Sequence, residues 1–476
     1  MDRSIADFYD GQSIFITGGT GFLGKVLVEK LLYSFSGISK IYLLMRQKCD
    51  ADIHKSLQDM LEKPVFLRLR NERPKSLNKI IPIIGDISEP KLGINEEDEQ
   101  MLIENVSIVF HAAATVRFNE PLKIAVNINV LGTLRVLDLC QRMRNKKAFV
   151  HVSTAYSNVN RKFVEEVIYP APATLEEVEN LIKAGITKDE VQRLISTKGR
   201  KNTYLFTKAI AESMVAQNHD TIPTIIVRPS VITSSKVEPI VGWIDSWLGA
   251  SSLTNAIAKG LNRVILGHPN NCVDLIPVDY VSNLIVVAAA KGTRSEDVAV
   301  YGSCTSEINP ITMKSLIDMC ITETVKHKFN DLPMPFCFYT RSKWLVTTIT
   351  FLIQIIPAYI ADMFLWIIGK RKRYLKLQTT VTLVRDTLEN FTNNSWVISA
   401  AKSTALYKSL SPSEREQFPF DPADIDWKEY IPSYCAGLGV KIYDFGGKQA
   451  TWCTKAALRA FCVSSRLMCS SCLLLV

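Results

Sequence analysis

Short runs of Ile, Val and Leu alternate with longer stretches of helical periodicity through the first half of the chain. Apolar runs without alternating polar residues are typical of parallel strands that are buried on both faces. The predicted strands are 13–17, 41–45, 80–85, 106–112, 148–153 and 224–227. The helical patterns between them are 22–35, 120–144 and 204–217. Strands and helices in this alternation predict an α/β fold built on a doubly wound parallel sheet.

The pattern changes after about residue 235. From 236 to about 330 it thins into loops rich in Gly and Pro, with helical runs at 280–291 and 313–325, which predicts a smaller substrate lobe. A hydrophobic segment, a polar helical region and an apolar tail follow. The expected organisation is a sheet domain with its lobe at 11–330, a hydrophobic membrane-associating segment at 340–373, a C-terminal helical domain at 375–445 and a hydrophobic tail at 450–476.

The loop after the first strand is rich in glycine and opens a helix: it reads Thr17-Gly18-Gly19-Thr20-Gly21-Phe22-Leu23-Gly24. Such glycines allow a tight turn, a close approach of backbone to phosphates, and close packing of helix on strand. The helix N-terminus offers its free N–H groups to a dinucleotide pyrophosphate. The motif therefore predicts a Rossmann-type cofactor site whose contacts come from Thr17, Gly18, Thr20, Gly21, Phe22, Leu23 and Gly24.

The residues at the carboxyl ends of the next three strands indicate which dinucleotide cofactor would bind. The second strand ends in Arg46, a base that accommodates the ribose 2′-phosphate, so we expect NADPH. The third ends in Gly85-Asp86-Ile87, which places the Asp86 carboxylate near the adenine amino group. The fourth ends in three small residues that leave room for the cofactor: Ala112, Ala113 and Ala114. The alternatives are a solvated charge at Arg46 and ordinary helix–sheet packing at the alanines.

Tyr204 and Lys208 lie four residues apart at the start of a helical run and therefore share one helical face. A phenol has an ordinary pKa near ~10, and a neighbouring ammonium favours the phenolate, so we expect a lowered pKa for Tyr204. Lys208 would also hold the ribose hydroxyls of the cofactor. A pair of this spacing also arises by chance on exposed helices.

Two further groups accompany this pair. The fifth strand ends in Ser153-Thr154, and a hydroxyl there would polarise a carbonyl beside Tyr204. We assign that role first to Thr154 and second to Ser153. Asn129, on the helical segment before the fifth strand, would tie Lys208 to solvent through a water. The candidate catalytic set is therefore Tyr204, Lys208, Thr154, Ser153 and Asn129.

Jointly, these motifs resemble the extended short-chain dehydrogenase/reductases, and within them the alcohol-forming fatty acyl-CoA reductases of eukaryotes. The segments that carry the second resemblance are 63–70, 111–118, 151–156, 227–230, 238–245, 276–281, 411–421 and 425–430. The similarity spans about residues 10–445. It implies an enzyme that turns a long-chain fatty acyl-CoA and two NADPH into a primary alcohol and free CoA, through an aldehyde-level intermediate. Such alcohols are precursors of waxes and ether lipids.

Net charge and cysteine content limit the classes of ligand and partner that the chain would bind. The net charge of +9 comes from Lys and Arg dispersed among acids, so we expect no nucleic-acid partner. The eleven cysteines are scattered, and their one C-x-x-C pair has no neighbouring His, so we expect no metal site. Arg68, Arg70 and Arg73 form a basic cluster, which is either a solvated face or a site for the CoA phosphates. A homo-oligomer is compatible with the sequence.

Two apolar segments point to membrane lipid as a partner. Residues 344–368 contain no Lys or Arg and are long enough to cross a ~30 Å hydrocarbon core as a helix. Pro357 and Asp362 disfavour a clean span, because an acid at the bilayer centre costs ~2.5–3.5 kcal/mol. Basic residues at both ends favour a kinked hairpin that enters the membrane and returns, and a buried helix pair is the alternative.

The apolar tail is the second segment. Lys455, Arg459 and Arg466 share a helical stripe there, which is typical of a membrane-surface element. Three tail cysteines are candidates for acylation: Cys462, Cys469 and Cys472. We expect a cytosolic catalytic domain attached to the membrane of the endoplasmic reticulum or of peroxisomes.

Two other functions stay open at this point. One is an extended reductase for a sterol or a nucleotide sugar, against which the segments 238–245 and 375–445 argue. The other is a non-catalytic, NADPH-binding membrane scaffold. Such scaffolds usually lose the Tyr or the Lys, and both are present here as Tyr204 and Lys208.

Overall fold

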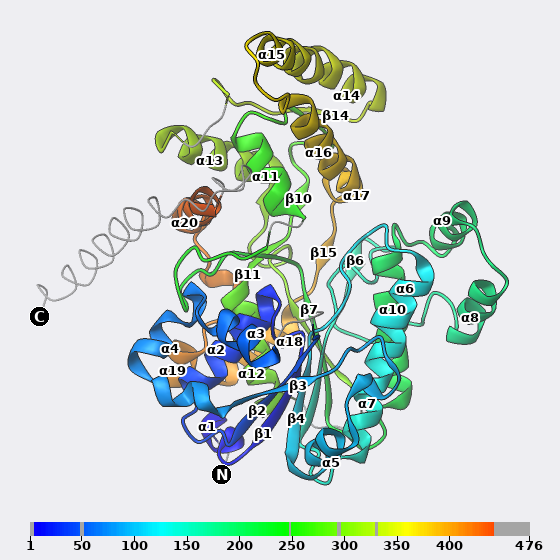
Figure 1. Ribbon diagram of the computed structural model, residues 1–476, viewed down its shortest axis with the longest axis vertical. Helices are drawn as coiled ribbons and strands as arrows, with labels where there is room; N and C mark the ends of the chain where they lie inside the picture. The colour runs from blue at the N-terminus through cyan, green and yellow to red at the C-terminus, as the bar shows by residue number, and fades with distance from the viewer. Residues whose placement is uncertain (1–3, 48–51, 247–248, 293–296, 329–331, 442–476) are drawn as a thin grey trace, which may run out of the picture.

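The computed structural model describes residues 4–47, 52–246, 249–292, 297–328 and 332–441. At its centre lies a seven-stranded parallel sheet in the order β12–β7–β5–β4–β1–β2–β3 (Figure 1). Its strands are β1 (Ser13–Thr17), β2 (Lys40–Met45), β3 (Ile80–Ile84), β4 (Val106–His111), β5 (Ala148–Val152), β7 (Thr224–Pro229) and β12 (Ala299–Ser303). The predicted doubly wound α/β fold is confirmed.

Helices cover both faces of this sheet (Figure 1). Successive side chains of a strand point to opposite faces, so Ile14 and Ile16 join one core while Phe15 joins the other. The first core is covered by α2 (Phe22–Ser34) and α12 (Val278–Lys291), and the second by α5 (Glu96–Asn105), α7 (Gly132–Arg142) and α10 (Thr203–Asn218). The order of the strands reverses at β1, which opens a crevice at the carboxyl edge of the sheet beside the glycine turn.

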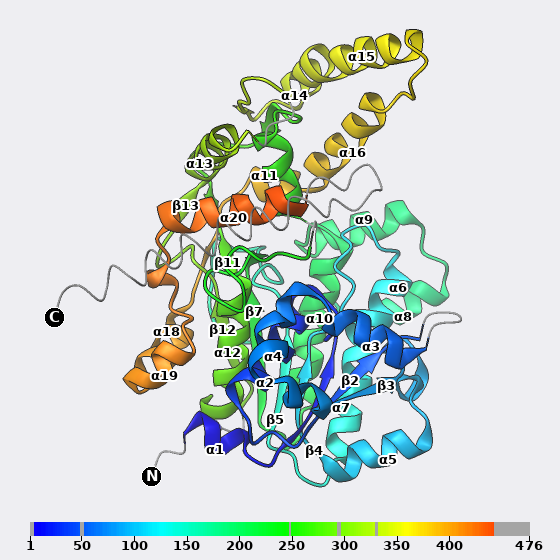
Figure 2. The same cartoon turned by 60° about the vertical axis from the view of Figure 1, so that its left-hand side comes forward.

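A second group of helices lies at one end of the sheet (Figures 1 and 2). It combines α11 (Ala250–Ala258) and α13 (Met313–Lys326) of the predicted lobe with α16 (Tyr374–Thr387) and α20 (Trp427–Lys441) of the predicted C-terminal region. Because α13 packs on α20 and α11 packs on α16, the lobe and the C-terminal helices share one core. The domain boundaries at 330 and 375 stay a prediction.

The C-terminal region also reaches the sheet itself. Its helix α18 (Ala401–Ser409) packs on β12, the seventh strand, which the hydrophobic pattern does not predict. Four short pairs of strands connect the remaining loops: β6 (Phe163–Val164) with β15 (Val397–Ile398), β8 (Val231–Thr233) with β11 (Leu275–Pro277), β9 (Val264–Leu266) with β14 (Phe338–Thr340), and β10 (Cys272–Val273) with β13 (Ile311–Thr312). Other helices are α1 (Ile5–Tyr9), α3 (Ile53–Leu61), α4 (Leu67–Glu72), α6 (Leu122–Val126), α8 (Leu175–Lys183), α9 (Lys188–Thr197), α17 (Glu389–Thr392) and α19 (Pro412–Gln417).

The apolar segment forms one helix, Lys343–Ile367, and not a hairpin. It consists of α14 (Lys343–Thr350), a π-helical turn at Phe351–Ile355, and α15 (Ile356–Ile367). The chain reverses only after this helix and continues into α16 (Figure 2). The alternative of a buried helix pair is also wrong, because most of its large apolar side chains are exposed. The tail at 450–476, with its candidate cysteines, lies outside the described residues.

Candidate active site

A tight glycine turn joins β1 to α2 at the carboxyl edge of the sheet. Gly18 has a φ of +73°, and a Cβ added there would lie 2.6 Å from the backbone nitrogen of Ala113. A Cβ added to Gly24 would lie 2.2 Å from the carbonyl oxygen of Gly18. Gly21 is the N-cap of α2 and supplies no side-chain acceptor to the first N–H groups of that helix. This backbone cradle fits the pyrophosphate of a dinucleotide.

The side chains around the turn divide into an outer and an inner group. Thr20 and Gly21 are exposed, and Phe22 and Leu23 are half-buried. Thr17 is fully buried, and its Oγ1 lies 2.7 Å from Nδ1 of His111. Thr17 therefore supports the turn from inside the sheet, and a direct contact between its side chain and the cofactor is disfavoured.

The residues expected near the adenosine lie at the ends of β2, β3 and β4. The exposed Nε of Arg46 lies 3.9 Å from Oδ2 of Asp86, so the structure brings these two groups together. Asp86 also accepts hydrogen bonds from the backbone nitrogen and the hydroxyl of Ser88 at 2.9 and 2.8 Å. Ile87 is buried. The three predicted small residues are half-buried at the sheet edge: Ala112, Ala113 and Ala114.

Tyr204, Thr154 and Lys208 meet at the carboxyl end of β5. Tyr204 lies in the first turn of α10, which Asn202 caps by accepting a hydrogen bond from the backbone nitrogen of Leu205. The hydroxyl groups of Tyr204 and Thr154 are hydrogen-bonded to each other. Nζ of the buried Lys208 donates to the carbonyl oxygen of Val152, 2.8 Å away. These contacts fix both side chains of the pair against the same strand end.

Ser153, the second candidate for polarising a carbonyl, lies beside this group. Its hydroxyl is buried and has no hydrogen-bond partner among the described residues. A buried hydroxyl without a partner loses free energy unless a ligand or a water bonds to it. Ser153 therefore retains hydrogen-bonding capacity for a ligand at the end of β5.

Burial sets the protonation of the pair. It raises the pKa of Tyr204 to about 12, and the hydrogen bond with Thr154 opposes that rise. Burial also lowers the pKa of Lys208 to about 8, against the attraction of Glu212. The direction for Tyr204 is the opposite of the one predicted from sequence, because removing a phenolate from water costs more than its neighbours return. At neutral pH the phenol is protonated and the lysine is charged.

Asn129 stands behind the pair in a π-helical turn, Asn127–Leu131, between α6 and α7. Its Nδ2 donates to Oγ1 of Thr207 and to the carbonyl oxygen of Thr115, both at 3.1 Å. Its Oδ1 accepts from the backbone nitrogen of Thr115 at 2.9 Å. Asn129 therefore holds the loop after β4 against α10, next to Lys208. Its link to Lys208 through a water stays a prediction.

An aromatic cluster that the sequence analysis missed surrounds Tyr204. The ring of Phe118, from the loop after β4, stacks on Tyr204 with a centroid distance of 6.0 Å and on Phe391 at 5.4 Å. Phe391 in turn meets Tyr156 edge-on at 5.0 Å, and Tyr156 meets Trp396 at 5.9 Å. Phe391 and Trp396 come from the C-terminal region, so this region forms one wall of the site. No local periodicity marks these two residues.

Comparison with known proteins identifies the family. Two family models, both described as "Male sterility protein", match residues 16–285 and 353–444. Fatty acyl-CoA reductase 1 of Homo sapiens is 37% identical over 449 residues, which cover 92% of this chain and 86% of the human protein. The chain belongs to the fatty acyl-CoA reductases. Fatty acyl-CoA reductase 2 of Mus musculus is 35% identical over 445 residues, 92% of this chain and 86% of the mouse protein.

Solved structures support the fold of this reductase. The terminal R domain from the myxalamid PKS-NRPS biosynthetic pathway superposes with a TM-score of 0.63 at 20% identity, covering 90% of each chain. The reductase domain of a nonribosomal peptide synthetase from Mycobacterium tuberculosis gives a TM-score of 0.58 at 16% identity, covering 90% of this chain and 92% of that domain. At these identities the likeness establishes a shared fold.

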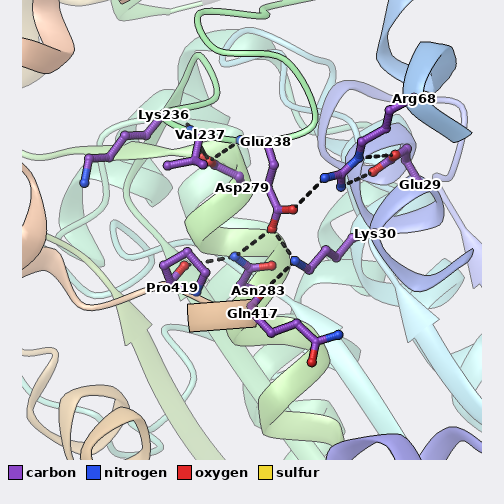
Figure 3. A network of polar contacts seen from close by, with 10 residues as sticks. All are labelled: Glu29, Lys30, Arg68, Lys236, Val237, Glu238, Asp279, Asn283, Gln417 and Pro419. Atoms are coloured by element: carbon purple, nitrogen blue, oxygen red, sulfur yellow. Dashed lines mark hydrogen bonds and ion pairs between the residues drawn. The ribbon is translucent and has the colours of Figure 1, made fainter. Parts of the chain in front are cut away.

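The family-like segment 238–245 belongs to a loop, residues 236–245, that we call the Glu-Pro loop. The buried carboxylate of Asp279 on α12 accepts hydrogen bonds from three successive backbone nitrogens of this loop, those of Lys236, Val237 and Glu238 (Figure 3). The side chain of Glu238 forms ion pairs with Lys30 and with Nη1 of Arg68, the latter at 3.0 Å. The loop is therefore attached to α12, α2 and α4 at once.

Arg68 completes this charge network and corrects an expectation. It also binds Glu29 in α2 through two hydrogen bonds of 2.7 and 2.8 Å, and Glu29 is fully buried (Figure 3). The guanidinium of Arg73 lies 4.8 Å from the ring centroid of Tyr33, and Arg70 donates to the carbonyl oxygen of Lys63 at 3.0 Å. Arg68 is thus paired within the protein and is not a solvated charge. A site for the CoA phosphates at this cluster stays a prediction.

The far end of the Glu-Pro loop lies against the start of α2, next to the glycine turn. The ring centroid of Trp243 lies 5.3 Å from that of Phe22, the first residue of α2. Asp245 forms an ion pair with Lys25 at 2.5 Å and with Lys63 at 3.6 Å. Because Phe22 and Lys25 belong to the first turn of α2, the loop borders the predicted pyrophosphate site. The sequence marks this loop only through its family resemblance.

Proposed function

We propose that this reductase converts long-chain fatty acyl-CoA to a primary fatty alcohol, with NADPH as the source of hydride. The observation that carries the proposal is the meeting of Tyr204, Thr154 and Lys208 at the carboxyl end of β5. It is supported by the relatives at 35–37% identity, whose names state a fatty acyl-CoA substrate.

Tyr204 and Thr154 would act together on the thioester oxygen. Two hydroxyl groups that donate to this oxygen stabilise the charge that develops there, and they bind it most strongly in the transition state. Bound NADPH would supply the hydride. Tyr204, protonated because of its raised pKa of about 12, would give its proton to the resulting oxyanion. Collapse of the hemithioacetal would break its C–S bond, release the CoA thiolate and return the hydroxyl proton to Tyr204. Thr154 and Tyr204 would then bind the aldehyde oxygen in the same way, and Tyr204 would donate its proton to the alkoxide formed with the hydride of a second NADPH.

Other residues would hold the cofactor. The glycine turn fits the pyrophosphate, and the ammonium of Lys208 would bind the ribose hydroxyls. We assign NADPH because the exposed guanidinium of Arg46 lies at the end of β2 beside Asp86. A cation there favours a 2′-phosphate, whereas an unpaired acid would favour the free hydroxyls of NADH.

The aromatic cluster would bind the acyl end of the substrate. Phe118, Phe391 and Tyr156 present apolar ring surface next to Tyr204, where the chain adjoining the thioester must lie. Aromatic side chains bury large apolar areas, so they suit a hydrocarbon chain better than a sugar. This wall disfavours a nucleotide sugar as substrate, and the intact pair of Tyr204 and Lys208 disfavours a non-catalytic scaffold.

We further propose that the reductase works at a membrane, through the exposed apolar helix Lys343–Ile367. Long acyl chains partition into bilayers, and the C-terminal region, whose α16 packs against this helix, also supplies Phe391 to the site. The catalytic domain would then face the cytosol at the endoplasmic reticulum or the peroxisome. Fractionation of cells that express the tagged chain, with immunoblots for both organelles, distinguishes the two.

The activity is tested with the full chain purified in detergent. The protein is mixed with palmitoyl-CoA and NADPH, the alcohol is measured by gas chromatography, and free CoA is titrated as thiol. We expect one thiol released and two NADPH oxidised per alcohol formed. A parallel panel of sterols and nucleotide sugars should give no oxidation of NADPH. Absence of both alcohol and thiol with palmitoyl-CoA would refute the proposed reaction.

A further inference from the structure

The helix Lys343–Ile367 has its polarity reversed relative to a surface helix of a soluble protein. Its inward stripe, with residues four apart, is largely polar: Val346, Thr350, Gln354, Ala358 and Asp362 are all buried. Its outward face carries large apolar side chains, and Trp344 and Trp366 are 71% and 66% exposed. The other exposed members of this face are Leu345, Phe351, Leu352, Ile353, Tyr359, Ile360, Met363, Phe364 and Ile367. A soluble helix buries its apolar stripe instead.

Two of the inward polar residues, Thr350 and Asp362, bind the helix to its neighbour α16. The carboxylate of Asp362 accepts hydrogen bonds from the backbone nitrogens of Arg373, Tyr374 and Leu375 at 2.8–2.9 Å. These are N–H groups at the start of α16, which otherwise lacks a side-chain cap. Near the other end, Nη1 of Arg385 on α16 donates to Oγ1 of Thr350. The helix is therefore attached to α16 at both Thr350 and Asp362, and its apolar face points outward.

Basic residues stand at both ends of the apolar face. Arg341 precedes the helix, Lys343 is its first residue and pairs with Glu389, and Lys370, Arg371, Lys372 and Arg373 follow it. The ammonium of Lys372 lies 5.7 Å from the ring centroid of Trp366. Tryptophans with adjoining Lys and Arg are typical of the level where lipid headgroups meet the acyl chains. The charge at both ends complements an anionic lipid surface and gives no preference for one side of a bilayer.

We infer that this helix lies in the plane of one leaflet of an anionic membrane and does not span it. The inference rests on the proposed membrane association and adds its geometry. A spanning helix would present Asp362, Gln354 and Thr350 to lipid or would have to take α16 into the bilayer with it, and a buried acid there is costly. In the plane of a leaflet, the outward rings enter the acyl region while Thr350 and Asp362 keep their contacts with α16.

Membrane binding is tested first, by flotation of the full chain with vesicles of phosphatidylcholine alone or with one-third phosphatidylserine. We expect flotation with both, at least fivefold stronger with phosphatidylserine at low salt. The double variant Phe364→Glu/Trp366→Glu should lose flotation at least tenfold while its reductase activity in detergent stays within twofold. The control Leu67→Glu/Val325→Glu, which changes two exposed apolar residues elsewhere, should float normally.

Orientation is tested with a protease recognition sequence inserted between Arg341 and Ser342 or, in a second variant, after Gly369. Both variants are bound to sealed vesicles, and each must retain activity in detergent. In-plane binding predicts that protease added outside cleaves both. Cleavage of only one, with protection of the other until detergent is added, would overturn the in-plane geometry while leaving the membrane association intact.

Two further outcomes would refute the in-plane membrane binding and leave the proposed reductase reaction unaffected. If the unmodified chain does not float with vesicles but is fully active in detergent, membrane association is refuted while the proposed reductase activity stands. The other outcome is a dimer, measured by light scattering without vesicles, that Phe364→Glu/Trp366→Glu converts to a monomer. If the unmodified chain also fails to float, the apolar face would be assigned to contact with a second copy of the chain.

Discussion

The backbone of Gly437 on α20 crosses that of Gly242 in the Glu-Pro loop, so closely that a Cβ on Gly437 would lie 1.8 Å from the Gly242 carbonyl oxygen. The hydroxyl of Tyr430, two turns earlier on α20, donates to the carbonyl oxygen of Ser234 at 2.8 Å. The loop is therefore held between α20 and α2. The C-terminal region thus contacts the cofactor side of the enzyme as well as the aromatic wall.

Replacing Gly437 by Ala should separate α20 from the Glu-Pro loop. A methyl group cannot fit against a backbone carbonyl, and overpacking of this kind costs about 1–3 kcal/mol. We expect a lower Tm by differential scanning fluorimetry and a weaker affinity for NADPH. The variant Lys428→Ala, on the exposed side of the same helix, should leave both unchanged. An unaltered Tm in Gly437→Ala would show that the crossing relaxes freely.

Replacing Tyr204 by Phe should remove the proton donor and keep the ring. General acid catalysis contributes ~10²–10⁴-fold, so we expect kcat for palmitoyl-CoA to fall by a factor in that range. NADPH binding, followed by its fluorescence, should change less than twofold. Tyr374→Phe, the same change on α16, should keep normal rates. Near-normal turnover in Tyr204→Phe would rule out Tyr204 as the donor.

The proximity of Tyr204, Lys208 and Thr154 was predictable from sequence because its signals are local. Tyr204 and Lys208 are one helical turn apart, and Thr154 follows a run of buried strand residues, so their positions depend on short segments. The aromatic cluster was not predictable, because Phe391 stacks on Phe118, the ring that also stacks on Tyr204, from about 270 positions downstream with no repeating pattern. Arg68 was misjudged for the same reason, since its partner Glu238 is distant in the chain.

The fold shows the same limit. The six predicted strands consist mostly of Ile, Val, Leu and Phe, and the structure has each of them within two residues of the expected ends. The seventh strand, β12, contains Gly302, where a Cβ would lie 2.2 Å from the carbonyl oxygen of Ser399. A contact with the C-terminal region thus requires a glycine inside a strand, which weakens the strand signal. The composition of residues 344–368 indicated the length of the apolar helix. It did not indicate which face of that helix is buried.

Cofactor use should depend on pH through Lys208. Its pKa is lowered to about 8, so its ammonium is present below that pH and is lost above it, whereas the phenol of Tyr204 stays protonated up to about 12. We expect kcat/KM for NADPH to be flat at pH 6–7 and to fall about tenfold per pH unit above 8. Lys208→Met should be slower throughout and lose this limb. A limb that persists in Lys208→Met would belong to another group.

Arg46 should determine the preference for NADPH over NADH. A charged hydrogen bond to a phosphate contributes about 1.5–3 kcal/mol, so Arg46→Ala should raise KM for NADPH by roughly 10–100-fold. KM for NADH should change less than twofold, because NADH lacks the 2′-phosphate. Lys40→Ala, at the opposite end of β2, should leave both values unchanged. Equal losses for the two cofactors would assign Arg46 a structural role through Asp86.

Glu238 should stabilise both the fold and the cofactor site. Its carboxylate faces Lys30 and Arg68, and Glu238→Gln leaves these two buried or half-buried cations with only Glu29 as an acidic partner in the network. Removing one partner of a buried ion pair costs about 3–5 kcal/mol, so the Tm should fall clearly. The Kd for NADPH should also rise, because Trp243 in the same loop packs on Phe22.

Val237→Ala, a truncation at the exposed neighbour, is the control for both measurements. A lowered Tm with unchanged NADPH affinity would confine the role of the loop to stability and separate it from the cofactor site.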